Sequence, residues 1–494
     1  MKEDDKGSKP GLHYTQDSEI TIRTTRTEGS DPETCPVGDP EKCIHTDNHD
    51  GLSELQPVPS RIESYAPGST FREDVDYPEG GLQGWLVVFG AFAGMMAAFG
   101  ILNTAGIFQA YFAEHQLQGY DESTLGWIFS IAFFLAFFCG IQIGPIFDAH
   151  GPRLLILGGS IMLLAAVVLL SFCAEYYQFV LVFGVMGGIG TSLVFTPAIS
   201  AISHFFCEKR GGATGLAATG GAIGGIIFPL MLQSLIPKVG FAWATRCVAL
   251  IYLVLCIISN IFIRSRLPPD PNQSVWPDFK IFRDPSFALV TAAVFCMEWG
   301  LFIPVTYLTS FAMSSGALSE GSGYDLIAIL NAGSVLGRWL PGVFADKIGR
   351  FNAMIITLAL CALTTIALWL PASLLAPPDS GEQGMEISVS GLKAIVIIYG
   401  FLFGFASGSN ISLTPVCVGQ LCRTEEYGRY YATCYTVVSL ASLTGVPIAG
   451  ALISACDGGY WGVVGFTGAV YVVSVILMVM AKGKKVGWNF TTKF

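Results

Sequence analysis

Two short polar stretches interrupt a very apolar sequence and decide how the chain folds. GPIFDAHGPR occupies residues 144–153, and GVFADKIGR occupies residues 342–350. Both carry a glycine, an acidic residue, a second glycine and an arginine in the same order. A repeat at this distance along the chain indicates a duplication with an equivalent turn in each half.

The composition is that of a membrane protein. Of 494 residues, 52% are hydrophobic and only 13% are charged. From Trp85 onward the apolar character comes in runs of about 20 residues, the length of a helix that crosses about 30 Å of hydrocarbon. Lipid permits only helices or closed barrels, and runs such as 154–170 lack the alternation of a barrel strand. We therefore predict an all-α membrane protein.

The apolar runs predict twelve transmembrane helices in two six-helix bundles. The expected spans are approximately 85–112, 125–147, 152–173, 178–206, 211–236, 241–263, 286–313, 323–345, 351–371, 391–417, 428–454 and 460–481. The expected units are a disordered cytoplasmic N-terminal tail over 1–84, an N-terminal bundle over 85–263, a cytoplasmic linker over 264–285, a C-terminal bundle over 286–481 and a cytoplasmic C-terminal tail over 482–494.

The N-terminal tail is acidic, rich in Ser, Thr, Pro and Gly, and has no apolar run that would form a signal peptide. It contains Cys35, Cys43, His45 and His49, but their spacing fits no common zinc finger, so we predict no metal site. The other cysteines fall mostly within spans, where cysteine behaves as a small hydrophobe, and we predict no disulfides.

Lysine and arginine are concentrated in alternate connections, which predicts that those connections and both termini face the cytoplasm. The basic residues on that side are Arg153, Lys209, Arg210, Arg264, Arg266, Lys280, Arg283, Lys347, Arg350, Arg423, Arg429, Lys482, Lys484 and Lys485. Lys238 and Lys393 are the exceptions. Asn272, Asn410 and Asn489 lie in glycosylation sequons, and this topology predicts that they carry no glycan.

The two repeated stretches are then equivalent cytoplasmic turns, after the second and the eighth helix. Their first glycine lets helices approach closely, their second permits a tight turn, and their aspartate can pair with an arginine or accept from a helix N-terminus. We predict a cytoplasmic gate built from Gly144, Asp148, Gly151, Arg153, Gly342, Asp346, Gly349 and Arg350.

These turns resemble the G-x-x-x-D-x-x-G-R signature of the major facilitator superfamily, over about residues 80–485 of the chain. The first copy departs from it by an extra Pro152. EGGLQGW at 79–85 and HFFCEKRGGATGLAATGG at 204–221 resemble signatures of the monocarboxylate porters, here of a fungal type. The resemblance implies two bundles that rock around a central site at the bilayer midplane.

Other functions fit poorly. The glycines of TGGAIGG at 219–225 lie in an apolar helix and follow no strand, which excludes a dinucleotide fingerprint. The six histidines lie in the tail or in or beside connecting turns, and no phosphate-binding loop of the ATPase type occurs. We therefore predict no enzyme, no cofactor and no nucleic-acid partner, and transport driven by gradients.

Two ionisable residues within spans are candidates for the solute site, because charge inside a membrane usually faces a cavity or a partner. Glu298 and Arg338 have similar predicted depths, compatible with an ion pair. Arg338 suits a substrate carboxylate, and Glu298 either carries a proton or neutralises Arg338. Arg246 is a third candidate, near the outer end of its helix.

Similarity to the porters also implies a substrate-linked arginine at the position of Arg338. Where proton-coupled porters carry a lysine and an aspartate, this chain has Asn103 and Ser334. Proton-driven transport of a lactate-type acid is accordingly disfavoured. Further hydrogen-bonding candidates are Gln109, Asn331, Asn410 and Tyr399, and candidates for stacking on a planar solute are Phe295, Trp299 and Trp339.

We therefore expect a secondary transporter in the plasma membrane, or else in an organelle membrane, that moves a small organic acid or related metabolite by alternating access. Export of a fungal secondary metabolite and uptake of riboflavin are the alternatives within transport. A non-transporting membrane receptor is the alternative outside it.

Overall fold

A computed structural model describes residues 77–268, 274–318, 323–375, 388–488 and 492–493. These described residues contain twelve helices that are long and apolar enough to cross a membrane, which confirms the predicted count. Secondary structure in the described ranges is entirely helical, as predicted. Asn272, Asn489 and the cysteines and histidines of the tail lie outside the described residues.

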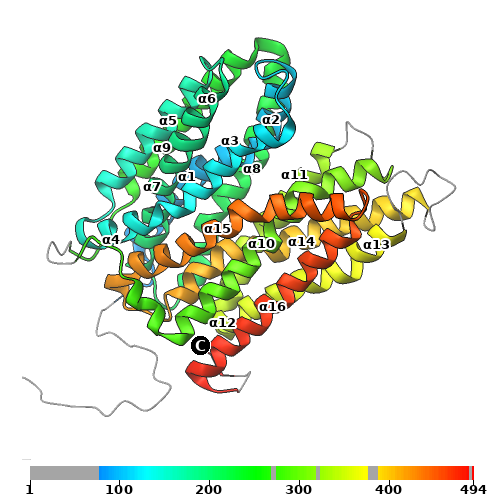
Figure 1. Ribbon diagram of the computed structural model, residues 1–494. Helices are drawn as coiled ribbons and strands as arrows, with labels where there is room; N and C mark the ends of the chain where they lie inside the picture. Colours follow the sequence, from blue (N-terminus) through cyan, green and yellow to red (C-terminus); the bar gives the residue numbers. More distant parts are fainter. Residues whose placement is uncertain (1–76, 269–273, 319–322, 376–387, 489–491, 494) are drawn as a thin grey trace, which may run out of the picture. The chain divides into compact units, whose positions relative to one another are not determined.

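Six spans make up the N-terminal bundle, coloured blue to green in Figure 1. Their elements are α1 (Gly81–Asn103), α2 (Ala105–Glu114), α3 (Glu122–Phe138), α4 (Gly140–His150), α5 (Arg153–Leu170), α6 (Tyr176–Phe179), η1 (Val180–Gly187), α7 (Gly188–Ser203), α8 (Arg210–Val239) and α9 (Phe241–Phe262). The first span combines α1 and α2, the second α3 and α4, and the fourth α6, η1 and α7.

Six further spans make up the C-terminal bundle, coloured green to red. Their elements, with the short η2 (Phe279–Arg283) before them, are α10 (Pro285–Ser314), α11 (Gly323–Ile348), α12 (Arg350–Thr364), η4 (Thr365–Trp369), α13 (Leu370–Leu375), α14 (Val389–Val418), η5 (Thr424–Glu426), α15 (Tyr427–Ala455) and α16 (Trp461–Val486). The last helix continues through three lysines, Lys482, Lys484 and Lys485, beyond the predicted end at residue 481.

The first helix begins before residue 85, where the first span was predicted to start. Helix α1 begins at Gly81, and the residues from Tyr77 onward are described. Glu79 explains the difference, because its carboxylate accepts hydrogen bonds from backbone amides of the 204–209 connection. A hydropathy pattern cannot detect such a polar attachment.

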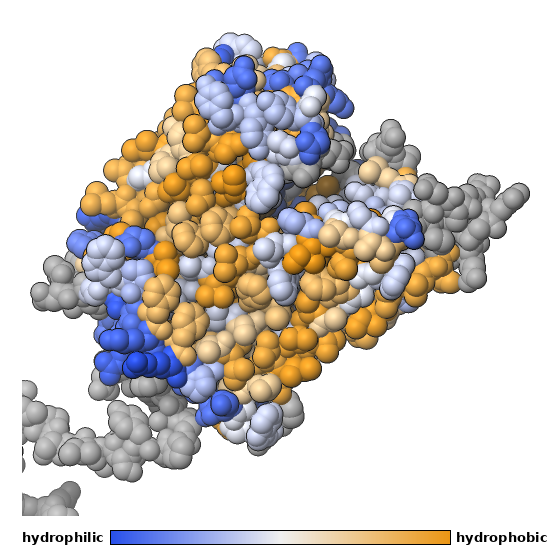
Figure 2. Space-filling model, viewed as in Figure 1, coloured by the Kyte–Doolittle hydropathy of each residue, from blue (hydrophilic) through white to orange (hydrophobic). Residues whose placement is uncertain are grey.

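Close helix packing relies on glycines four residues apart. Gly333 and Gly337 of α11 lie against backbone carbonyls of α14, and Gly404 and Gly408 of α14 lie against those of α11. Both helices therefore carry the small-x-x-x-small pattern that permits close approach inside a membrane, where van der Waals packing replaces the hydrophobic effect. Many apolar side chains form a buried core, and others face outward, as Leu154 does with 79% of its surface exposed. Figure 2 shows this apolar surface along the helices and hydrophilic residues at their ends.

We predict that Gly337→Ala destabilises the C-terminal bundle. A methyl group there would meet the backbone carbonyl of Phe405, which cannot move without displacing α14, at a cost of about 1–3 kcal/mol. The measurement is the apparent melting temperature in detergent, with Gly126→Ala as control because a methyl group at Gly126 meets open space. Equal melting temperatures for the two variants would contradict the packing argument.

Candidate solute site and gate

Five of the connections between spans lie at one end of the helices, which we call the basic end. Its connections precede α5, α8, α10, α12 and α15, and the chain also enters α1 there. Arg153, Lys209, Arg210, Lys347 and Arg350 lie at this end. Both repeated turns are therefore found together at one end of the spans.

Asp346, at the end of α11, binds the start of α8 in the other bundle. One carboxylate oxygen accepts from the amide of Gly211 and the other from the amide of Gly212, both at 2.8 Å. These amides belong to the second and third residues of α8, where no intrahelical acceptor exists. The positive end of the helix dipole adds electrostatic attraction for the carboxylate.

Asp148, at the end of α4, repeats this arrangement in the opposite direction. Its two oxygens accept from the amides of Gly428, at 3.0 Å, and Arg429, at 2.8 Å. These are the second and third residues of α15, so each bundle binds a helix start of the other. We call the two arrangements the clasps. Of the two roles predicted for the aspartates, binding to a helix N-terminus is confirmed.

The first glycine of each turn makes this contact possible. A side chain on Gly342 would collide with the carbonyl of Gly211, and one on Gly144 with the carbonyl of Gly428. The second glycines, Gly151 and Gly349, have φ of 78° and 100°, which any larger residue tolerates poorly.

The two arginines differ. Arg350 lies in the interface and donates to the backbone carbonyl of Cys207 in the other bundle. Arg153 is exposed and forms no hydrogen bond with the described residues. Each arginine is the first residue of its helix, but Pro152 precedes Arg153 where Gly349 precedes Arg350. Arg153 therefore does not share the contact made by its counterpart.

Arg338 is buried between the bundles, with 6% of its surface exposed. Its Nη1 donates to the carbonyl of Ala218 on α8 at 2.7 Å, and its Nε to the Ser334 hydroxyl at 3.3 Å. Three of its five N–H groups thus form no hydrogen bond to the described residues. A desolvated guanidinium with free donors is suited to bind an anionic group.

Asn103, Ser334 and Asn331 lie near this guanidinium or on its helix face. The Asn103 amide donates to the carbonyl of Gly221 at 3.3 Å, and a side chain on Gly221 would touch Nη1 of Arg338. Asn331 and Ser334 precede Arg338 by seven and four residues, which places all three on one face of α11. The structure therefore brings Asn103 and Ser334 to Arg338 and places Asn331 about two turns away on the same helix face.

Glu298 is placed differently from the expectation. Its side chain is 1% exposed, and neither carboxylate oxygen has a hydrogen-bond partner among the described residues. No ion pair with Arg338 occurs in the part of the chain that the structure describes, since the guanidinium turns toward α8. Tyr435 and Tyr471 are the polar rings within electrostatic range of Glu298, and Tyr435 is also within range of Arg338.

The sequence analysis missed an aromatic cluster that joins the bundles. Phe99, Phe137 and Phe195 come from the N-terminal bundle, and Tyr431 and Tyr435 from α15. The ring centroids of Phe137 and Tyr435 are 5.2 Å apart, and those of Phe195 and Tyr431 are 5.9 Å apart. Both tyrosine hydroxyls are buried and lack a hydrogen bond in the described structure. Tyrosines four residues apart in YYATCY were the available signal.

In the described structure, no hydrogen bond or ring contact joins the other aromatic candidates to Arg338. Trp299 donates from its indole to Thr444 at 2.8 Å within the C-terminal bundle, and Trp339 has 44% of its surface exposed. Arg246 stacks on Phe172 and Trp243, 5.1 Å from each ring, near the opposite end of the helices.

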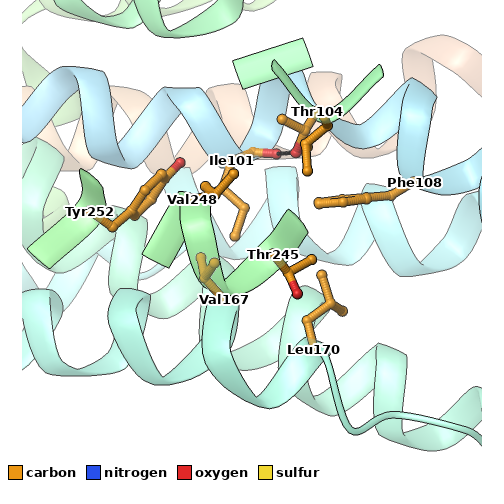
Figure 3. Close-up of a pocket in the computed structure, with 9 residues that line it drawn as sticks. Ile101, Thr104, Phe108, Val167, Leu170, Thr245, Val248 and Tyr252 are labelled. Atoms are coloured by element: carbon orange, nitrogen blue, oxygen red, sulfur yellow. Dashed lines mark hydrogen bonds between the residues drawn. The ribbon is translucent and has the colours of Figure 1, made fainter. Parts of the chain in front are cut away.

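Figure 3 shows a small cavity inside the N-terminal bundle, between α1, α2, α5, α8 and α9. Its space of about 10 Å³ is that of roughly one water molecule. The Thr104 hydroxyl at its edge already donates to the carbonyl of Ile101 at 2.5 Å. Because it is this small and lies within one bundle, we assign it no solute.

Comparison with known proteins agrees with this architecture. The family model described as Major Facilitator Superfamily matches residues 84–380. The chain therefore belongs to the major facilitator superfamily and is a transporter, as its sequence predicted.

Three fungal relatives are named as transporters or efflux proteins, and two of the names state a solute. MFS-type transporter 1 of an Ophiocordyceps species is 36% identical, covering 82% of this chain and 86% of its own. The riboflavin transporter MCH5 of Saccharomyces cerevisiae is 33% identical, covering 84% and 81%. The fujikurins efflux protein of Gibberella fujikuroi is 33% identical, covering 83% and 85%. These relatives give the receptor alternative no support.

We predict that Asp346→Ala loosens the start of α8. Loss of a carboxylate cap costs about 1 kcal/mol, which corresponds to about fivefold faster exchange of the protected amides. The measurement is hydrogen–deuterium exchange of a peptide that contains Gly211 and Gly212. The control is Arg153→Ala in the equivalent turn, and equal exchange in both variants would show that the clasp carries no stability.

Proposed function

We propose that the chain transports an organic anion with a flat or aromatic body, and that Arg338 binds its acidic group. The observation that carries this proposal is the buried guanidinium with three free N–H groups at the contact between the bundles. In a site shielded from water, such a group binds a carboxylate or an ionised phenol through paired hydrogen bonds. Asn103, Asn331 and Ser334 supply neutral hydrogen-bonding groups beside it.

The aromatic cluster supports a flat solute. Tyr431 and Tyr435 offer ring faces for stacking and hydroxyl groups that lack partners in the described structure. Tyr435 lies within electrostatic range of Arg338, which supports placing both residues at one site. The relative that is named a riboflavin transporter provides an independent reason to test planar compounds.

Efflux of a secondary metabolite is the second candidate, and the relative named a fujikurins efflux protein favours it. The two candidates differ in direction and solute rather than in the site. We further propose that the basic end faces the cytoplasm of a plasma-membrane transporter, because loops rich in lysine and arginine stay on that side.

Alternating access follows from where the contacts lie. The hydrogen bonds between the bundles, as far as the chain is described, run from the Arg338 level to the basic end. Breaking the clasps would open the solute site toward the basic end. Because Arg338 itself donates to Ala218 of the other bundle, solute that competes for the guanidinium would loosen this contact.

We predict that Arg338→Ala reduces saturable flux in proteoliposomes more than tenfold. The reason is that the variant loses a hydrogen bond between a charged group and the solute, which contributes about 1.5–3 kcal/mol of binding free energy. The panel consists of labelled monocarboxylates, aromatic acids and riboflavin. Arg338→Lys keeps the charge but loses the planar fork, so we expect it to raise KM.

The matched control is Arg246→Ala, which removes a partly buried arginine of another span that stacks on Phe172 and Trp243. Undiminished flux in Arg338→Ala, or equal losses in both alanine variants, would contradict the assignment of Arg338.

We also propose that Glu298 is the proton-carrying group. A carboxylate with no hydrogen-bond partner is costly inside a bundle, so the neutral acid is favoured in this conformation. The titratable groups in its electrostatic surroundings are Tyr435 and Cys434 of α15 and Tyr471 of α16, none of which is a cation. Contact with water in another conformation would release the proton.

We predict that Glu298→Gln abolishes the pH dependence of net uptake and leaves solute exchange intact, because glutamine has the shape of the neutral acid. Flux is measured over a range of external pH, with Glu114→Gln, an exposed carboxylate, as control. A pH profile that is unchanged in Glu298→Gln would refute the proposal.

A further inference from the structure

The residues that lead into α1 make more contacts than a connecting segment requires. Residues 77–80, which we call the strap, have the sequence YPEG. The Glu79 carboxylate accepts from three consecutive backbone amides, those of Cys207 at 2.7 Å, Glu208 at 2.6 Å and Lys209 at 3.0 Å. Successive amides that converge on one carboxylate form an anion-binding nest, here occupied by the chain itself.

Two further contacts fix the strap in this place. The Glu79 amide donates to the carbonyl of Phe205 at 3.2 Å, and the Lys209 ammonium donates to the carbonyl of Glu79 at 3.3 Å. Glu79 has a φ of 47°, a conformation that non-glycine residues rarely adopt. The contacts to the 204–209 connection hold the residue in this conformation.

The nest leads directly into the first clasp. Lys209 directly precedes α8, which begins at Arg210. The amides of the next two residues, Gly211 and Gly212, bind Asp346. Two carboxylates therefore converge on one helix start, Glu79 from the same bundle and Asp346 from the other. By fixing the amides of residues 207–209, Glu79 sets the direction in which the next amides point.

The strap also reaches the second clasp. The Tyr77 hydroxyl lies 2.5 Å from the hydroxyl of Thr424, in the connection that precedes α15. The Arg266 guanidinium lies 6.0 Å from the Tyr77 ring. The start of α15 binds Asp148 in the second clasp. The strap therefore contacts both connections that lead into the clasps, the one before α8 and the one before α15.

We infer that Glu79 is a positioning residue for the gate and that residues 77–80 strap the basic end in its closed conformation. This inference rests on the proposed alternating access. Opening of the basic end separates the start of α8 from the start of α15, so the strap must release Tyr77 from Thr424 or Glu79 from its nest. The EGGLQGW segment begins with Glu79, so this inference gives its first residue a physical role in the gate.

His204, in the connection that the strap contacts, does not make the strap sensitive to pH. Burial and the neighbouring cations Arg210 and Arg266 lower the pKa of His204 to about 3, so it stays neutral at physiological pH. Its Nδ1 lies 2.8 Å from the Ser265 hydroxyl, a structural contact. The strap therefore depends on the Glu79 carboxylate and the Tyr77 hydroxyl.

The test compares Glu79→Gln with Glu208→Gln, an exposed acid on the same connection. In Glu79→Gln we expect about tenfold faster hydrogen–deuterium exchange at residues 207–209 and faster exchange at Gly211 and Gly212 as well. Tyr77→Phe should speed exchange at residues 424–429 and leave 207–209 unchanged. Faster exchange confined to 207–209 in Glu79→Gln would reduce Glu79 to a local cap and overturn the inference.

Measuring solute flux separately from each side of a vesicle distinguishes an altered gate from general destabilisation of the protein. If Glu79→Gln favours the state that is open at the basic end, the apparent affinity for solute rises from that side and falls from the other. A merely destabilised protein loses flux equally from both sides, which would also overturn the inference. Absence of flux in the wild-type protein would instead refute the proposed solutes, while the exchange experiment still tests the strap.

Discussion

The structure depends on a carboxylate at the end of one helix binding the free amides at the start of another, twice, and each time across the two bundles. Asp346 of α11 binds the start of α8, Asp148 of α4 binds the start of α15, and the internal duplication relates the two arrangements. Each bond is charge-assisted and complements a helix dipole, yet each can exchange for water when the helices separate. Such an interaction is strong enough to close one end and weak enough to release it.

Other contacts between the bundles lie at the basic end or above the clasps. Glycines at 144 and 342 allow the helix backbones to approach, and Glu79 adds a carboxylate to the start of α8. Above the clasps lie Arg338 and the aromatic cluster, where contacts between the bundles also run through side chains. A solute bound at the proposed site would lie directly behind the closed end, so that binding and opening would be coupled without a separate relay.

The architecture was predictable because membrane helices obey strong constraints. Apolar runs gave twelve spans, and the repeated turn identified equivalent positions such as Asp148 and Asp346. Depth along a helix was predictable too, but rotation about it was not. For that reason Arg338 and Glu298 were expected to pair, whereas the guanidinium reaches the Ala218 carbonyl and the carboxylate stays among tyrosines. Residue spacing does not encode which neighbour a long side chain selects.

The most direct measurement is the distance between the bundles at the basic end in lipid nanodiscs. Genetically encoded spin labels at the exposed positions Glu208 and Lys347 avoid the 13 native cysteines. The account predicts one short distance without solute, and a second, longer one when Asp148 and Asp346 are both replaced by alanine. An unchanged distance distribution in that double variant would contradict the claim that the clasps hold this end closed.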